Sequence, residues 1–110
     1  MIPNAQNAQI PDAKLRDYLL STEHPVGRFK AQFFLALGFR PSDIEPLRAE
    51  LLRIAADSEE STSVASPHGT KVVARGTVAS PTGRQASVVT VWMLLPGNPS
   101  PRFITAYPDP

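Results

Sequence analysis

The residues best suited to acid–base chemistry lie close together near the start of the chain, at His24 and Lys30. An imidazole titrates near neutral pH without help, so His24 can give or take a proton in a reaction. His24 directly precedes Pro25, which places it at the entrance of a predicted helix, where backbone amides have no partner within the helix. The alternative is a surface histidine that only caps this helix.

Lys30 lies on the apolar side of the same predicted helix, among Val26, Phe33 and Phe34. An unpaired ammonium is costly to bury, so the side chain must either extend to the edge of the core or meet a partner. The first outcome carries no function. The second would direct a cation into a cleft, where it could stabilise the charge of a phosphate.

A second set of polar residues is expected on one face of a sheet. Residues 70–79 and 84–95 are β-branched runs joined by Ser80-Pro81-Thr82-Gly83, which predicts a hairpin with Ala79 opposite Arg84. Because side chains alternate, one face would pack on the helices through Val72, Ala74, Gly76, Val78, Val89, Val91 and Met93. The open face would carry Lys71, Arg75, Thr77, Arg84, Thr90 and Trp92.

A third strand over residues 102–107 would extend this face if Leu95 pairs with Arg102. It would add Thr105 and Tyr107 to the open face and direct Ile104 and Ala106 into the core. The basic residues would then suit a phosphate backbone, and Trp92 and Tyr107 would offer stacking surfaces for bases. Arg102 is either another phosphate contact or the polar end of its strand. The alternative for the whole face is an ordinary solvated antiparallel sheet.

Three helices are expected before the strands, over residues 12–21, 25–37 and 42–57. The third begins with the capping-box spacing of Ser42 and Glu45, and Gly38 would end the second. Residues 58–69 are a polar connector, and residues 1–11 a flexible N-terminal arm. The prediction is a single α+β domain over residues 12–108, with three N-terminal helices packed on a three-stranded antiparallel β-meander as a two-layer sandwich.

Composition limits the remaining possibilities. The chain has 110 residues, 42% hydrophobic content, no cysteine and a formal net charge of +1, which suits one globular domain without disulfides. No apolar stretch is long enough to span a membrane and no signal peptide is evident, so a cytoplasmic protein without a membrane partner is expected. The acidic residues do not align with the basic face, and neither a metal site nor a cofactor is expected.

Three segments together resemble a family of small, functionally uncharacterised bacterial domains of about this length: His24-Pro25-Val26-Gly27-Arg28-Phe29-Lys30-Ala31 with Phe33-Phe34, then Gly83-Arg84-Gln85-Ala86 leading to Thr90-Val91-Trp92, then Pro101-Arg102-Phe103-Ile104-Thr105-Ala106-Tyr107-Pro108. The order of elements is also similar to that of the barnase–EndoU–colicin–RelE superfamily. Members of that superfamily are metal-independent ribonucleases, and many are toxins.

The resemblance implies RNA cleavage by attack of a 2′-hydroxyl on the adjacent phosphate, which leaves a 2′,3′-cyclic phosphate. Transferred to this chain, it makes His24 the acid or base and makes Lys30 and Arg84 the charge stabilisers. Thr90, Thr105 and Tyr107 would position the phosphate or donate a proton. RNA binding would fall to the remaining residues of the basic face, Lys71, Arg75, Trp92 and Arg102.

Two hypotheses without catalysis remain open beside this toxin-like endoribonuclease. In the first, the basic face is a binding module for nucleic acid or protein. In the second, the chain is an immunity-type partner that covers a basic toxin with the acidic residues in and after the third helix, Asp43, Glu45, Glu50, Asp57, Glu59 and Glu60. The expected partners are therefore RNA, or a cognate antitoxin or immunity protein.

Overall fold

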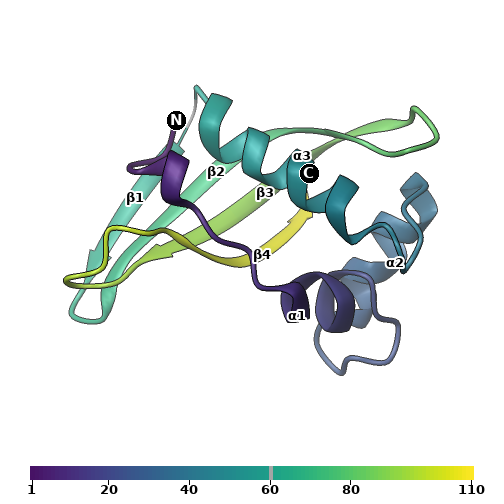
Figure 1. Ribbon diagram of the computed structural model, residues 1–110, viewed down its shortest axis with the longest axis horizontal. Helices are drawn as coiled ribbons and strands as arrows, with labels where there is room; N and C mark the ends of the chain where they lie inside the picture. The colour runs from purple at the N-terminus through teal and green to yellow at the C-terminus, as the bar shows by residue number, and fades with distance from the viewer. Residues whose placement is uncertain (60) are drawn as a thin grey trace.

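The computed structural model describes residues 1–59 and 61–110, in which a helical N-terminal half precedes a four-stranded antiparallel sheet (Figure 1). The helical segments are η1 (Ala5–Asn7), α1 (Asp12–Lys14), the π-helical turn η2 (Leu15–Leu19), α2 (Arg28–Leu37) and α3 (Ile44–Asp57). The strands follow in spatial order as β1 (Ser61–Ser66), β2 (Gly69–Ala79), β3 (Gln85–Leu94) and β4 (Arg102–Pro108). The predicted α+β class, with helices packed on an antiparallel sheet, is confirmed.

The helices divide into two groups in Figure 1: α3 runs along one face of the sheet, while α1, η2 and α2 gather at one end, beside β4. Gly76 of β2 allows α3 to approach, because a Cβ there would lie 2.8 Å from Ile54 Cγ1. Gly38, at a φ of +122°, ends α2 as expected. The expected capping box of Ser42 and Glu45 does not form, because α3 begins at Ile44 and its N-cap residue is Asp43, which makes no side-chain cap hydrogen bond. The Asp43 carboxylate accepts instead from the backbone N–H of Arg40.

The prediction of three strands is wrong, because residues 61–66 of the expected connector form β1. This strand pairs with β2 from Ser61 opposite Ala74 to Ser66 opposite Gly69, and all six of its residues are exposed. An edge strand exposed on both faces has no alternation of apolar and polar residues. Its pairing depends on backbone hydrogen bonds and on the tight turn before Gly69, whose φ is +138°.

The expected hairpin register is wrong by one residue. Ala79 pairs with Gln85 instead of Arg84, because Gly83 adopts a φ of +91° in a turn closed by the Ser80 N–H bond to Arg84 O. A glycine in this conformation adds a bulge residue beside the turn. A shift of one residue reverses every side chain of the following strand. The residues of β2 that face the helices are the expected ones. In β3, the residues expected to face the helices lie on the other face, and those expected on the open face lie toward the helices.

The exchange turns Thr90 and Trp92, both expected on the open face, toward the helices. Val89, Val91 and Met93 take their place on the other face, in register with Arg75, Val73 and Lys71, where Val89 and Val91 are nevertheless buried. Trp92 packs edge-to-face on Phe103 of β4, with ring centroids 5.3 Å apart, beneath the helices. The chain therefore uses its one tryptophan as a core residue.

A bulge between Val91 and Trp92 shifts the pairing of β4. Ala106 is buried as expected, and Thr105 lies in register with Val91 on the open face, as does Tyr107 with Val89. The expectation for Ile104 is wrong, because the bulge displaces it to the edge of the sheet, where it is 36% exposed.

The first eleven residues lie against the sheet and α3. Ile2 is fully buried and its backbone N–H donates to Ala55 O at 2.9 Å. Gln9 joins the outer edge of β4, donating to Pro101 O and accepting from the Phe103 N–H. The segment expected as a flexible arm thus contributes to the core and covers part of an edge strand.

Candidate functional site

His24 caps the N-terminus of α2. Its Nδ1 atom accepts hydrogen bonds from the backbone N–H groups of Val26 at 3.0 Å and Gly27 at 2.9 Å. These amides precede the first turn of the helix and have no partner within it. Because Nδ1 acts as an acceptor, the neutral ring carries its proton on Nε2. His24 therefore presents an N–H donor beyond the helix end.

Lys30 extends from the first turn of α2 to two hydroxyl groups. Its Nζ donates to Tyr18 Oη at 2.7 Å and to Thr105 Oγ1 at 2.8 Å. The two hydroxyls are 3.0 Å apart and hydrogen-bonded to each other. Three elements thus converge on one half-buried ammonium: η2 through Tyr18, α2 through Lys30 and β4 through Thr105. Lys30 thus meets partners at the edge of the core, while its expected role toward a phosphate stays a prediction.

Aromatic rings surround this ammonium. The Tyr18 and His24 rings meet edge-to-face with centroids 5.0 Å apart. Lys30 Nζ lies 5.3 Å from the Tyr18 centroid and 6.0 Å from the Tyr107 centroid, within the range of cation–π attraction. We refer to Tyr18, His24, Lys30, Thr105 and Tyr107 as the Lys30 cluster.

The cluster changes the acidity of the Tyr18 phenol. Partial burial acts to raise the pKa of Tyr18, but the hydrogen bonds from Lys30 and Thr105 and the charges of Lys30 and Lys14 outweigh burial. The pKa of Tyr18 therefore lies below its usual value of 10.0. Stabilising a phenolate beside a cation prepares this group to accept a proton.

A cavity of about 330 Å³ opens beside the cluster, lined by Pro11, Ala13, Lys14, Asp17, Tyr18 and His24. Lys14 Nζ lies 5.1 Å from the Tyr18 ring centroid. A ligand in this cavity would meet Tyr18 and His24 together with the cation of Lys14 and the carboxylate of Asp17.

The structure brings together four of the residues expected in the site: His24, Lys30, Thr105 and Tyr107. It does not bring Arg84 to them. Arg84 Nη1 donates to Ala36 O near the C-terminal end of α2, six residues beyond Lys30, or roughly 9 Å along the helix axis. This bond ties the hairpin to α2.

Thr90 and Trp92 also lie away from the cluster. Thr90 Oγ1 donates to Ala74 O at 2.8 Å and accepts from Trp92 Nε1 at 2.9 Å, and both side chains are fully buried. They satisfy each other within the core.

Lys71, Arg75 and Arg102 are exposed, and Lys71 lies in register with Met93, which pairs with Arg102. Arg75 forms an ion pair with Asp109, with Nε and Oδ2 3.6 Å apart. The open face is thus basic as expected, but Val89, Val91 and Met93 replace the threonine and tryptophan expected between the cations.

Tyr18 is the central residue that the sequence did not reveal. Tyr18 shares the apolar side of a short helical segment with Leu15 and Leu19, which explains its ring but not its hydroxyl. The sequence offered one signal, an amphipathic side chain six residues before His24. Its partners come from α2 and β4, and spacing along the chain cannot bring those elements together.

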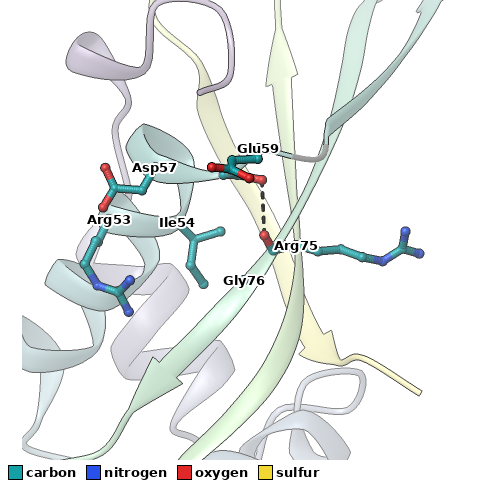
Figure 2. A pocket seen from close by; sticks show the side chains of 7 residues that line it. Arg53, Ile54, Asp57, Glu59, Arg75 and Gly76 are labelled. Carbon is teal, nitrogen blue, oxygen red and sulfur yellow. Dashed lines mark hydrogen bonds between the residues drawn. The ribbon is translucent and has the colours of Figure 1, made fainter.

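A second cavity of about 320 Å³ lies where α3 ends against β2 (Figure 2). Figure 2 shows the Arg75 side chain directed away from it, while Arg75 O accepts from Ser58 Oγ at 3.1 Å. Arg53 is held by Glu50 at 3.1 Å and by Thr77 O at 2.6 Å. The polar groups here therefore join α3 to the sheet.

The acidic residues of α3 mostly face arginines. Ion pairs join Glu45 and Asp12 to Arg48, Glu50 to Arg53, and Asp43 to Arg40. Glu60, which was grouped with them, lies outside the described residues. Within residues 1–59 and 61–110, no group of three or more histidine or carboxylate side chains could hold a metal ion. In the same ranges, none of the helices has the length and apolar character needed to cross a bilayer.

The sequence profile described as "Domain of unknown function (DUF6883)" matches residues 1–110, so the chain belongs to this family. Among solved structures, it is similar to a chain of a contact-dependent growth inhibition toxin–immunity protein complex from Klebsiella pneumoniae 342. The TM-score is 0.77 and the identity 19%, over 96% of this chain and 97% of the other. At this identity the likeness concerns the fold. No protein of curated function matches.

Proposed function

We propose that this chain is a toxin-like endoribonuclease that cleaves RNA at the Lys30 cluster by attack of a 2′-hydroxyl on the adjacent phosphate. The observation that carries the proposal is the ammonium of Lys30, which is held by two hydroxyl groups. Among the described residues, no carboxylate forms an ion pair with it. Its charge is therefore available to a phosphate.

The reaction assigns one task to each group of the cluster. Tyr18, in its phenolate form, takes the 2′-hydroxyl proton as the 2′-oxygen attacks phosphorus. Lys30 and Thr105 stabilise the charge that develops on the non-bridging oxygens. The bond from phosphorus to the 5′-oxygen breaks, and Tyr107 gives that oxygen a proton. The products are a 2′,3′-cyclic phosphate and a 5′-hydroxyl, and water returns both tyrosines to their starting states.

His24 acts in this proposal as a hydrogen-bond donor, not as the base. Its Nδ1 lone pair is occupied by the N–H groups of Val26 and Gly27. The Nε2–H group remains to bind a phosphate oxygen at the end of α2. Arg84, Thr90 and Trp92 have no part in the reaction, while Lys71, Arg75 and Arg102 would supply charge along the path of the RNA.

The fold comparison bears on the partner. The similar chain comes from a complex described as a toxin with its immunity protein. We propose the toxin role for this chain, because a cation held by hydroxyls can serve phosphate chemistry. The alternative immunity role would use the acidic side of α3, and the arginines there already neutralise much of that charge. A cognate immunity protein would then cover the Lys30 cluster.

Incubation of the pure protein with mixed RNA and tRNA in EDTA tests this function. The wild type is expected to produce fragments, and the double variant His24→Ala/Lys30→Ala is expected to leave the RNA intact. The matched control is Arg28→Met, which removes an exposed cation from the same helix. Intact RNA with the wild type would favour the binding module. Equal cleavage by the wild type and the double variant would overturn the assignment of the reaction to the Lys30 cluster.

A further inference from the structure

A third cavity adjoins the one beside Tyr18 and His24. It measures about 170 Å³ and lies at the outer edge of β4, lined by Pro11, Lys14, Met93, Leu95, Arg102, Phe103 and Ile104. Pro11 and Lys14 line both cavities. A molecule bound at the Lys30 cluster could therefore continue past Lys14 into this third cavity.

The third cavity is built by two irregularities of the fold. The bulge between Val91 and Trp92 displaces Ile104 from the core to the rim, and bulges commonly redirect a side chain in this way. The hydrogen bonds of Gln9 with Pro101 and Phe103 hold the N-terminal segment against β4, and Pro11, two residues further on, lines this cavity together with Ile104. The wall is thus formed from segments far apart in the sequence.

Its chemistry is apolar within and cationic at the ends. Methionine, leucine, phenylalanine and isoleucine side chains form the wall, and the cations are Lys14 on the side of the Lys30 cluster and Arg102 on β4. A volume of about 170 Å³ is smaller than the roughly 300–1,000 Å³ typical of pockets for drug-sized ligands, and it suits one ring system. An apolar cavity with two cations in its lining suits a nucleobase together with the phosphates adjoining it.

We infer that this third cavity is a base-binding subsite, and that the enzyme acts on RNA with an unpaired nucleotide beside the scissile phosphate. The inference rests on the proposed function, because the Lys30 cluster defines the position of that phosphate. A base in a duplex is stacked and paired, so it cannot enter. Asp17 also lines the cavity beside Tyr18. Its carboxylate would repel a phosphate there, which favours a path of the RNA backbone along Lys14.

Binding of an uncleavable strand tests the subsite apart from catalysis. The probe is a fluorescent 2′-O-methyl RNA of mixed sequence, which lacks the attacking hydroxyl, offered single-stranded or annealed to its complement. Single strands are expected to bind about tenfold more tightly than the duplex, because stacking in a protein site is worth roughly that much per base. Equal affinity for both forms would overturn the inference.

The variant Ile104→Glu places a carboxylate at the rim of the third cavity and is expected to weaken single-strand binding about tenfold. Its control is Val64→Glu, the same change at an exposed valine of β1, with no effect expected. Equal effects of the two changes would contradict the subsite. A single-strand preference without any cleavage in EDTA would overturn only the proposed reaction. Cleavage without that preference would overturn only the subsite.

Discussion

Two cations of this molecule join the helices to the sheet in different ways. Arg53 links α3 to β2 by donating to Glu50 and to Thr77 O, so a carboxylate neutralises its charge. Lys30 links α2 to η2 and β4 by donating to the hydroxyls of Tyr18 and Thr105, which carry no formal charge as phenol and alcohol. Arg53 thus joins two elements and Lys30 joins three, and the two cations also differ in whether a carboxylate neutralises their charge.

Under the proposed function, this difference distinguishes a contact that only stabilises the fold from one that also acts on RNA. A cation paired with a carboxylate gains little from a passing anion, because the attraction is already satisfied. A cation held only by hydroxyls is positioned yet still attracts a phosphate. Lys30 also favours a phenolate at Tyr18, which lowers the pKa of Tyr18. When this phenolate takes the 2′-hydroxyl proton it becomes neutral, and the charge of Lys30 is then available to the phosphate.

The largest expected effect is on cleavage when each cation is removed in turn. Lys30→Met should lower kcat/KM for RNA by roughly 10²–10³-fold, because one charge-stabilising donor is lost. Arg53→Met should leave kcat/KM unchanged and lower the free energy of unfolding by up to about 1 kcal/mol. RNA cleavage rates and urea denaturation measure the two effects, and equal loss of activity in both variants would remove the distinction.

Substitution of two threonines on neighbouring strands, Thr90 and Thr105, should likewise affect stability in one case and cleavage in the other. Thr90→Val leaves the buried Trp92 Nε1 without its acceptor and should cost about 1–3 kcal/mol of stability. Thr105→Val removes a hydroxyl from the Lys30 cluster, so it should reduce cleavage and leave stability nearly unchanged. Denaturation and kinetics on both variants would show this pattern, and a large loss of stability in Thr105→Val would contradict it.

The pH dependence of cleavage should follow the ionisation of the Tyr18 phenol. Its pKa lies below the usual 10.0, and its phenolate form is the proposed base, so kcat/KM should rise with pH with a midpoint below pH 10. Tyr18→Phe should abolish this rise. The pH–rate profiles of the two proteins test the role, and an unchanged rise in the variant would assign the base to another group.

The smallest effect is expected at Glu50. Burial acts to raise the pKa of Glu50, but hydrogen bonds from Arg53 and the Ala79 N–H and the charge of Arg53 hold it below its usual 4.5. The ionised carboxylate is thus favoured in the folded state and stabilises the fold. This contribution to the free energy of unfolding is fully present above pH 4.5 and is lost as the pH falls through the lower pKa that Glu50 has in the folded protein. Glu50→Gln should flatten the acid limb of the stability curve, with no change in cleavage.

The fold class and the β2 face could be predicted from the sequence because they depend on patterns within single segments. Helical periodicity located α3, and alternation placed Val72 and Val78 in the core. The faces of β3 were missed because they depend on the backbone angle of Gly83, which adds one residue to the turn. Strand β1 was missed because both of its faces are exposed.

The candidate site was predicted in part for a related reason. His24 and Lys30 could be singled out because their positions relative to one predicted helix carry the signal: His24 stands at its entrance, and Lys30 is a basic residue on its apolar side that needs a partner. The identity of that partner depended on the packing of η2 and β4, so Tyr18 was not found. Trp92, which was predicted beside Tyr107 as a stacking surface, was assigned to the open face because of the register error and belongs to the core.

The central claim is that a 2′-hydroxyl attacks a phosphate at the Lys30 cluster. The most direct measurement maps the cleaved linkage in EDTA, then compares that RNA with the same strand carrying a single 2′-deoxy nucleotide on the 5′ side of the scissile phosphate. We expect 2′,3′-cyclic phosphate ends from the first strand and no cleavage at that position in the second. Cleavage of the deoxy strand, or products ending in a 3′-hydroxyl, would contradict the mechanism.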